Sequence, residues 1–474
     1  MKKLLLLFFP FLLFSQTTPP TILWERIYEN NYTPNRGNVF SSILKASSNE
    51  YILIANINET NFPDDEYNSI LKINSNGDLI WLQNYNIFFY QNSLIQTIAK
   101  CTDNLYYVLA KNCEDNQQTS IQQLDDEGNL LANWCYPIQG GSGFNSIIDT
   151  NDGGLLISSQ NIVTKLNAQK EIQWSTGVHY ENIFTSLLET SDGHFLAVGV
   201  GYANRDELEE SQTGLCYYVK IDSNGNILWE KNFGAPNATL EGVSTVKEMT
   251  NGNFLLNCYT DGDLQNGNIG NCTNTWMVTT DSSGNIINSF TLTSNGTPAA
   301  MSFSKIILEP DGGYVVGTWI SHCSTPSGPP IYAFRLIKVN SNNTIAWDVS
   351  FTDGIIYDIE RTAEGDYIAV GTDYNPSVFG SGSLKAMKIG WEPLSTPSFE
   401  NSVSIYPNPA QDFIMVKNNF TENQAVVIYN VAGQTIIKQE INQNENSLDV
   451  SQLANGIYFV HLPESNTTLK WIKG

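Results

Sequence analysis

The segment Tyr217-Tyr-Val-Lys-Ile-Asp-Ser-Asn-Gly-Asn-Ile-Leu-Trp229 decides the fold, because it recurs along the chain. A close copy reads Ser69-Ile-Leu-Lys-Ile-Asn-Ser-Asn-Gly-Asp-Leu-Ile-Trp81, and weaker copies end at Trp174 and Trp347. Degenerate copies bring the number to six: Asp125-Asp-Glu-Gly-Asn-Leu-Leu and Asp281-Ser-Ser-Gly-Asn-Ile-Ile. Each copy is a pair of β-rich runs around a tight turn, and spacings of roughly 40 to 60 residues are typical of propeller blades.

A second hairpin lies between these copies. It is clearest at Ile147-Ile-Asp-Thr-Asn-Asp-Gly-Gly-Leu-Leu-Ile157 and Ile306-Ile-Leu-Glu-Pro-Asp-Gly-Gly-Tyr-Val-Val316, where Asp and Gly supply the positive φ that a tight turn needs. Related turns make seven in all, at Ser48-Asn49, Asp103-Asn104, Asp192-Gly193, Asn251-Gly252 and Glu364-Gly365. Each repeating unit therefore contains four strands, which we call A, B, C and D in chain order.

The strand count predicts how the repeat closes. The first unit has its strands at residues 41–46, 51–56, 69–74 and 79–84, whereas the seventh has A at 355–361, B at 367–371, C at 384–389 and no D. The segment Ile22-Leu-Trp24-Glu-Arg-Ile-Tyr28 resembles the D strands in its Trp. We expect it to complete the seventh unit, because this would remove an exposed sheet edge. The sequence therefore predicts an all-β fold, a seven-bladed β-propeller over residues 22–390, rather than an open sandwich.

The repeat resembles that of bacterial surface-protein propellers and, more loosely, the quinoprotein-type blade with its Gly-x-x-x-Trp ending. The Trp, Gly and Asp positions recur from unit to unit, so we expect them to serve packing and turn formation rather than a unique active site. No Gly-x-Ser-x-Gly, His-Glu-x-x-His or Gly-x-x-x-x-Gly-Lys motif is present. The sequence therefore assigns no catalytic and no cofactor-binding residue, although a propeller site can be assembled from several blades.

Connection lengths differ between the two faces of the predicted propeller. The A–B and C–D turns are short in every unit, whereas the B–C and D–A connections are longer and more variable, and these emerge together on the opposite face. Loops on a rigid scaffold are where binding residues concentrate. We therefore expect the face with the B–C and D–A loops, including residues 199–216 and 259–274, to be the interaction surface.

One of these loops is bracketed by cysteines. The chain has seven cysteines, between Cys101 and Cys323, and the odd number leaves at least one without an intramolecular partner. Cys258 and Cys272 flank one loop, so a disulfide between them is our first expectation. Four side chains in that loop could offer oxygen ligands to calcium: Asp261, Asp263, Asn266 and Asn268. Cys272 stands where an EF-hand has its Glu, so a solvated polar loop is the simpler interpretation.

The N-terminus has the parts of a secretory signal. Lys2 and Lys3 precede an apolar run over residues 4–14, which Ser15 and Gln16 follow. Residues 1–15 are therefore predicted to be a signal peptide cleaved between Ser15 and Gln16, since the run is too short to span a bilayer. No later segment is apolar for long enough to form a membrane helix. A net charge of -24, from 24 Lys and Arg against 48 Asp and Glu, argues against nucleic acid as a partner.

The sequence changes character after a predicted linker at residues 391–400. From residue 401 onward short alternating strands are separated by turns, which predicts a small β-sandwich. Its motifs resemble the type A C-terminal sorting domain of the type IX secretion system of the Bacteroidota: Tyr406-Pro407-Asn408-Pro409, Gly433, Asn455-Gly456 and Lys473. The resemblance covers residues 401–474. It implies engagement with the type IX secretion machinery, passage across both membranes, and attachment to the outer cell surface or release.

These observations leave the ligand of the propeller open. The leading hypothesis is a secreted or surface-attached binding protein whose loop face holds a glycan or a protein. The alternative is a secreted hydrolase, lyase or quinone-dependent oxidoreductase with its site at the propeller axis, and a purely structural surface role is a third possibility. Convergent acidic, basic or aromatic side chains at the loop-face mouth of the axis would favour an enzyme. A face without such a cluster would favour binding.

Overall fold

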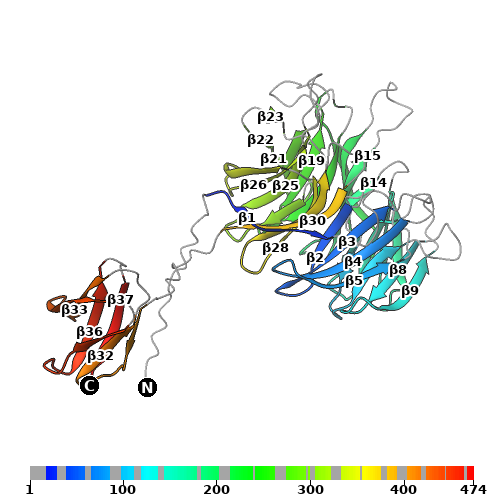
Figure 1. Ribbon diagram of the computed structural model, residues 1–474. Helices are drawn as coiled ribbons and strands as arrows, with labels where there is room; N and C mark the ends of the chain where they lie inside the picture. The colour runs from blue at the N-terminus through cyan, green and yellow to red at the C-terminus, as the bar shows by residue number, and fades with distance from the viewer. Residues whose placement is uncertain are drawn as a thin grey trace, which may run out of the picture. The chain divides into compact units, whose positions relative to one another are not determined.

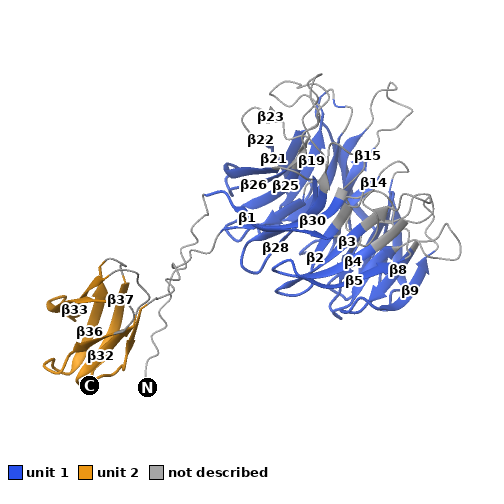
Figure 2. Ribbon diagram, in the orientation of Figure 1, with its two compact units in different colours: residues 1–391 blue, residues 392–474 orange. Residues whose placement is uncertain are grey.

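The structure is a computed structural model of the 474-residue chain. It describes residues 18–28, 39–58, 66–85, 98–110, 119–136, 144–178, 183–201, 214–236, 238, 241–261, 274–294, 297–298, 305–321, 332–352, 355–374, 382–391, 403–417, 423–442, 445–463 and 467–474. The chain forms two compact units, residues 1–391 and residues 392–474, which Figure 2 draws in different colours. The predicted signal peptide and almost all of the predicted linker lie outside the described residues.

The described residues of unit 1 form seven four-stranded antiparallel sheets, and each sheet is one blade. In six of them the strands are consecutive in sequence, and we number the blades 1 to 7 in the order in which they follow here. The blades are β2 (Val39–Lys45), β3 (Glu50–Asn58), β4 (Glu66–Asn74), β5 (Leu79–Tyr85); β6 (Ile98–Lys100), β7 (Tyr106–Ala110), β8 (Thr119–Leu124), β9 (Leu130–Tyr136); β10 (Phe144–Asp149), β11 (Leu155–Ser159), β12 (Ile162–Leu166), β13 (Ile172–Gly177); β14 (Ile183–Glu189), β15 (Phe195–Gly201), β16 (Leu215–Ile221), β17 (Ile227–Phe233); β18 (Glu241–Glu248), β19 (Phe254–Thr260), β20 (Asn274–Thr280), β21 (Ile286–Thr291); β24 (Lys305–Leu308), β25 (Tyr314–Ser321), β26 (Tyr332–Val339), β27 (Ile345–Thr352); and β28 (Ile355–Arg361), β29 (Tyr367–Tyr374), β30 (Gly382–Gly390) with β1 (Thr21–Tyr28). A short ribbon of β22 (Thr293–Ser294) and β23 (Thr297–Pro298) follows blade 5.

The N-terminal strand closes the seventh blade. Strand β1 pairs antiparallel with β30, with Ile22 opposite Ile389 and Tyr28 opposite Leu384. Figure 1 shows β1, at the blue end of the chain, beside β30. The innermost strands contact one another in turn, from β2 through β6, β10, β14, β18, β24 and β28 back to β2. The ring is therefore closed, and the predicted seven-bladed β-propeller is confirmed.

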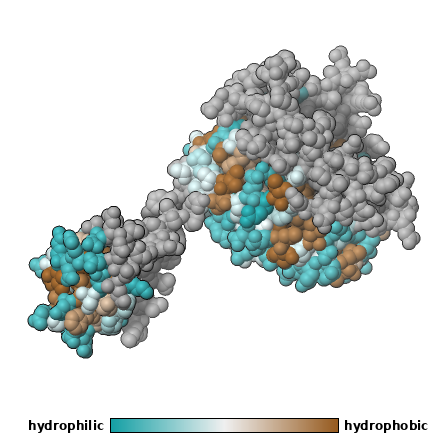
Figure 3. Space-filling view, in the orientation of Figure 1, coloured by the Kyte–Doolittle hydropathy of each residue, from teal (hydrophilic) through white to brown (hydrophobic). Residues whose placement is uncertain are grey.

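The hydrophobic core lies between the blades. Every residue of β11 and of β19, both second strands, is buried, whereas the outermost strands β13 and β21 are mostly exposed. Some aliphatic side chains of the outermost strands remain at the surface, among them Leu130, Leu131 and Ile287. Figure 3 shows apolar patches between polar ones on the described surface of unit 1.

Tryptophans of the outermost strands join neighbouring blades. The ring of Trp24 in β1 packs on Gly77, in the C–D turn of blade 1, and its Nε1 donates to the Ser75 carbonyl at 3.1 Å. Gly77 has a φ of +79°, and a Cβ at this position would lie 2.9 Å from the ring. The same arrangement joins the next blades through Trp81 on Gly128, Trp174 on Gly225 and Trp229 on Gly284. The repeated Trp and Gly are therefore two halves of one packing contact, as expected from their recurrence.

Blade 7 has no C–D turn, because β1 supplies its outermost strand. Trp391, directly after β30, fills the corresponding place: its ring meets that of Trp347 in β27 edge-on, with the centroids 6.1 Å apart. The Nε1 atom of Trp391 donates to the carbonyl oxygen of Thr18 at 2.8 Å. This single residue therefore packs against blade 6 and also ties the end of unit 1 to the segment that precedes β1.

Charged side chains at the end of several inner strands contact the A–B turn of the preceding blade. Glu189 Oε2 accepts a hydrogen bond from the Asn151 backbone N at 2.7 Å, and Glu248 accepts from the backbone N and the Oγ of Ser191, both at 2.6 Å. Arg361 forms an ion pair with Glu309 at 3.2 Å. These contacts explain the charges of this position by blade-to-blade attachment.

Unit 2 is a β-sandwich, as the sequence predicts. One sheet has the order β31 (Ser404–Tyr406), β32 (Phe413–Lys417), β35 (Glu445–Asp449), and the other has the order β34 (Thr435–Ile441), β33 (Gln424–Asn430), β36 (Gly456–Leu462), β37 (Thr467–Lys473). The core between the sheets includes Ile414, Val460 and Trp471. Trp471 is completely buried and packs on Tyr458 with a centroid distance of 5.6 Å, so the last strand accommodates a ring at this core position. None of the described residues forms a helix that could span a bilayer.

Candidate functional site

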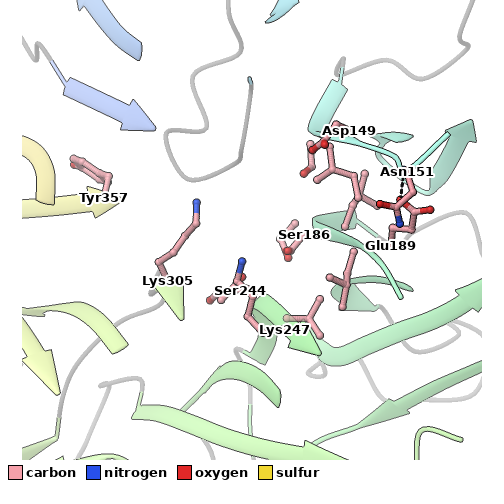
Figure 4. A pocket seen from close by; sticks show the side chains of 15 residues that line it. Asp149, Asn151, Ser186, Glu189, Ser244, Lys247, Lys305 and Tyr357 are labelled. Carbon is pink, nitrogen blue, oxygen red and sulfur yellow. Dashed lines mark hydrogen bonds between the residues drawn. The ribbon is translucent and has the colours of Figure 1, made fainter. Parts of the chain in front are cut away.

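A polar cavity of about 320 Å³ lies in the channel of the propeller. It is lined by inner-strand residues of blades 3 to 7, from Ser146 to Tyr357, and reaches Asn151 in the A–B turn of blade 3. Figure 4 shows Lys305 between Tyr357 and Ser186. Because it reaches an A–B turn, the cavity extends towards the face of the short turns. This face is opposite to the one that the loop lengths predict to be the interaction surface. The long B–C and D–A loops fall mainly on residues outside those that the structure describes, so that expectation remains a proposal.

The inner strands can be aligned on the residue whose backbone N–H closes the A–B turn, from Ala46 in blade 1 to Thr362 in blade 7. Two positions before that residue, five blades carry an aliphatic side chain: Leu44, Ala99, Ile148, Leu188 and Ile307. Blade 5 carries Lys247 and blade 7 carries Glu360 at the same position. A residue shared by all blades serves the scaffold, whereas a charge that replaces an aliphatic residue needs another explanation.

The same break in symmetry appears four positions before the turn residue. Blades 1, 3, 4 and 5 place a small hydroxyl residue there: Ser42, Ser146, Ser186 and Thr245. Blade 6 instead has Lys305 and blade 7 has Asp358. The four exceptional charges, Lys247, Lys305, Asp358 and Glu360, all belong to the adjacent blades 5, 6 and 7. We refer to these four residues as the axial cluster.

Two members of the axial cluster are held in place by each other. The Nζ of Lys305 lies 3.0 Å from the Asp358 carboxylate, which is almost completely buried. That carboxylate also accepts hydrogen bonds from Ser42 Oγ at 3.1 Å and from the Ile43 backbone N at 3.0 Å. Asp358 therefore connects blades 6, 7 and 1, and the pair has a structural role, although Lys305 also lines the cavity.

The other two members lack such partners. Among the described residues, no hydrogen bond or ion pair is formed by the Lys247 ammonium group, which lines the cavity. Burial lowers its pKa, and the nearby Lys305 charge adds to this effect. Burial also raises the pKa of the Glu360 carboxyl, which accepts a hydrogen bond from the Arg361 backbone N at 3.2 Å. Each group influences the pKa of the other, although they do not form an ion pair.

A carboxyl group that lines the cavity itself, that of Asp149, has a similar environment. Burial raises the pKa of Asp149 in β10, and a hydrogen bond from its own backbone N–H opposes the shift. The cavity wall thus combines a lysine, Lys247, and a carboxyl group, Asp149, whose charged forms are both disfavoured by burial. Such perturbed groups in a cleft are typical of functional sites, because burying an unpaired charge is costly. Chemically, the Lys247 ammonium group can bind an anion, and the lysine and carboxyl groups can exchange protons with a ligand.

The sequence did not single out any residue of the axial cluster. A signal was present, because the Asp-Gly type turns allow the A strands to be aligned and two positions before the turn a Lys and a Glu interrupt an aliphatic series. The calcium candidates Asp263, Asn266 and Asn268 lie outside the described residues, and Asp261 is the first residue after β19. No group of three or more His, Cys, Asp or Glu side chains within the described ranges is arranged to hold a metal ion.

The expected disulfide between Cys258 and Cys272 remains a prediction, because only one of the two cysteines is described. Cys258 is a buried free thiol within β19, and Cys272 lies outside the described residues. The Cys258 side chain belongs to the hydrophobic cluster between blades 4 and 5, where it contacts the thiol of Cys216. Cys135 is disulfide-bonded, and Cys101 is a buried free thiol.

In unit 2 the predicted sorting motifs meet at one place. Asn408 Oδ1 accepts from the Ile472 backbone N at 2.9 Å, and Gly456, next to Asn455, pairs with Lys473 across β36 and β37. Lys473 Nζ donates to the Gln411 carbonyl. Tyr406, Pro407 and Pro409 flank the same contact, with cis peptide bonds before both prolines. Gly433 lies apart, in the β33–β34 turn, with a φ of +77°.

Comparison with known proteins places unit 2 in a family. The Secretion system C-terminal sorting domain family matches residues 404–473. Beta-agarase A of Zobellia galactanivorans is 32% identical over 80 residues, which is 16% of this chain and 14% of the agarase. The chain thus matches about one seventh of the length of that relative. The C-terminal residues are a type IX sorting domain, which indicates export to the cell surface or secretion.

Solved structures are similar to this chain at low sequence identity. Virginiamycin B lyase of Staphylococcus aureus is 12% identical with a TM-score of 0.46, and the alignment covers 78% of this chain and 100% of the lyase. A protein of unknown function from Bacteroides caccae is 13% identical with a TM-score of 0.39, covering 72% of this chain and 99% of that one. The Pan2 WD40 domain of Neurospora crassa is 13% identical with a TM-score of 0.39, covering 64% and 91%. At these TM-scores and identities the likenesses carry nothing about activity.

Proposed function

We propose that this protein is an exported binding module whose propeller holds a glycan or protein ligand and whose axial cavity receives one acidic unit of that ligand. The observation that carries the proposal is Lys247, a lysine without a described partner in the wall of a 320 Å³ cavity. Ligand sites are concave, and volumes near 300 Å³ are at the small end of their range. The cavity therefore has room for a sugar-sized group rather than for a folded surface.

The polarity of the cavity favours a hydroxylated carboxylate. An anionic group placed at Lys247 would supply the counter-charge that the described residues do not provide, and it would restore the ordinary pKa of the ammonium group. Ser186, Ser244 and Thr185 in the cavity wall offer hydroxyl groups to the hydroxyl groups of a sugar. A uronic acid unit of a glycan combines both features, as would a carboxylate side chain presented by a protein.

The test uses the full chain and acidic oligosaccharides as the probe. Oligogalacturonates and oligoglucuronates should bind in a calorimetric titration, and neutral galacto-oligosaccharides of equal length should not. Lys247→Met should weaken this binding about thirtyfold, because a hydrogen bond to a charged group contributes about 2 kcal/mol. Lys231→Met is the matched control, since Lys231 lies in β17 and donates to Asn285 Oδ1 at 2.7 Å, away from the cavity. Equal binding of acidic and neutral probes, or equal affinity of Lys247→Met, would refute the proposal.

The opposing pKa shifts favour a second candidate, a lyase. Lys247 with a lowered pKa can act as a base, and Glu360 with a raised pKa can act as an acid. In a β-elimination the amine removes the proton next to the carboxylate while the carboxyl group protonates the leaving oxygen. The product is an unsaturated uronate that absorbs ultraviolet light. Appearance of this absorbance with the same probes, and its loss in both Lys247→Met and Glu360→Gln, would identify the enzyme.

A further inference from the structure

Two thiols meet in the core between blades 4 and 5. Cys216 lies in β16, the third strand of blade 4, and Cys258 lies in β19, the second strand of blade 5. Their exposed fractions are 0% and 1%, and both belong to one hydrophobic cluster. The two thiol groups are hydrogen-bonded, and the sulfur of Cys216 also accepts from the backbone N of Gly242 in blade 5. Residues 42 positions apart in sequence are thus brought into side-chain contact by blade packing.

We propose that Cys216 and Cys258 form a disulfide that cross-links blade 4 to blade 5 in the exported protein. Type IX export takes the chain out of the cytoplasm, and structural disulfides form and persist in such compartments. The number of cysteines is consistent with this pairing. Cys135 is already disulfide-bonded, whereas Cys101 is buried in another cluster with its sulfur 3.9 Å from the Gly154 carbonyl oxygen. Cys101 is therefore suited to be the odd thiol of the seven.

The oxidation is an ordinary thiol–disulfide exchange. A thiolate of one cysteine attacks the disulfide of a periplasmic oxidant protein or of oxidised glutathione and forms a mixed disulfide. The second cysteine then displaces the oxidant, so two electrons and two protons pass from the cysteine pair to the oxidant, which leaves as a dithiol or as two thiols. Burial raises the pKa of Cys216 well above its ordinary value in the folded propeller. The exchange is therefore expected before the two blades pack, and the finished bond is protected from reductants.

The cross-link would fix one wall of the channel. Strand β19 pairs with β18, where Cys258 is opposite Val243, and β18 carries Lys247 four residues further on. A bond from Cys258 to blade 4 would hold β18 and β19 against β14 to β16. The position of the Lys247 ammonium group relative to Ser186 of blade 4 would then be set by a covalent connection in addition to packing.

The test is disulfide mapping of the full chain after refolding with reduced and oxidised glutathione. Free thiols are blocked with N-ethylmaleimide in denaturant, and the unreduced protein is digested and analysed by mass spectrometry. The expected result is one cross-linked peptide pair that contains Cys216 and Cys258, with Cys101 alkylated. Alkylation of both Cys216 and Cys258, or a cross-link from Cys258 to Cys272, would overturn the proposal.

A stability comparison provides an independent measurement. The closed loop spans residues 216 to 258, and loss of a cross-link over such a loop should lower the melting temperature by about 5 °C. Cys216→Ala and Cys258→Ala should each cause this decrease, and the double variant should melt no lower than the single ones, because the bond is lost only once. Cys101→Ala, which also removes a buried thiol, is the matched control and should leave the mapped peptide unchanged. Additive decreases in the double variant would contradict the cross-link.

Discussion

Replacing Gly225 by alanine should destabilise the propeller more than the same change at Gly193, although both glycines lie in turns of blade 4. Their φ values are +88° and +77°, so an alanine at either position pays a similar cost of roughly 1 to 2 kcal/mol for the left-handed conformation. A Cβ at Gly193 meets nothing within 4 Å, whereas at Gly225 it would lie 2.8 Å from the ring of Trp174. Overpacking of this kind adds roughly 1 to 3 kcal/mol.

The assay is urea denaturation followed by tryptophan fluorescence, with thermal melting as a second measurement. Gly193→Ala should reduce the free energy of unfolding by about 1 kcal/mol and Gly225→Ala by about 3 kcal/mol. In a Trp174→Leu background the ring is absent, so the additional cost of Gly225→Ala should disappear. Equal losses for the two glycine variants, or an unchanged difference after removal of the ring, would refute the idea that the turn must closely approach the indole.

Two further predictions concern the channel and the ring closure. Burial raises the pKa of Glu360 above its ordinary 4.5, so the stability that its protonated form provides is fully present below that value and is lost as pH rises through the folded-state pKa. The melting temperature of Glu360→Gln should therefore exceed that of the wild type by an amount that grows between pH 4 and pH 7. A constant difference in melting temperature would contradict this. Trp391→Ala should lower the free energy of unfolding by about 2 kcal/mol, about half the loss for a fully buried ring, because Trp391 is partly exposed. An unchanged denaturation midpoint would show that the contacts of Trp391 with Trp347 and Thr18 do not support closure.

The propeller was predictable because its signals are local. A turn glycine such as Gly77 and the Trp that follows it lie within a dozen residues of each other. There is one more A–B hairpin than there are C–D hairpins, so one D strand has to be sought at the N-terminus. The partner of each Trp was not predictable in the same way. Trp391 replaces a missing turn and bonds to Thr18, a residue 373 positions away, so its role depends on the closed ring rather than on any motif.

The cysteines also show that contacts between blades are difficult to predict from the sequence. Cys258 and Cys272 flank one loop, and sequence proximity therefore suggested that they pair. Packing offers Cys258 a second candidate partner, because adjacent blades place the third strand of one against the second strand of the next, and Cys216 is the residue that meets Cys258 there. Contacts within a blade follow from the repeat, whereas contacts between blades depend on how the repeats are stacked.

The axial cluster involves both a position that repeats in every blade and contacts between blades. A seven-fold scaffold has seven equivalent inner positions, and an aliphatic residue at each would be the stable choice, as Leu44, Ile148, Leu188 and Ile307 show. Lys247 and Glu360 take that place in blades 5 and 7 at a cost in solvation that their pKa shifts record. Asp358 is different, since its bonds to blades 1 and 6 account for it structurally. A charge that costs stability and holds no neighbour in place is best explained by what the channel receives, and for this reason Lys247 rather than Lys305 is the residue on which the function should be tested.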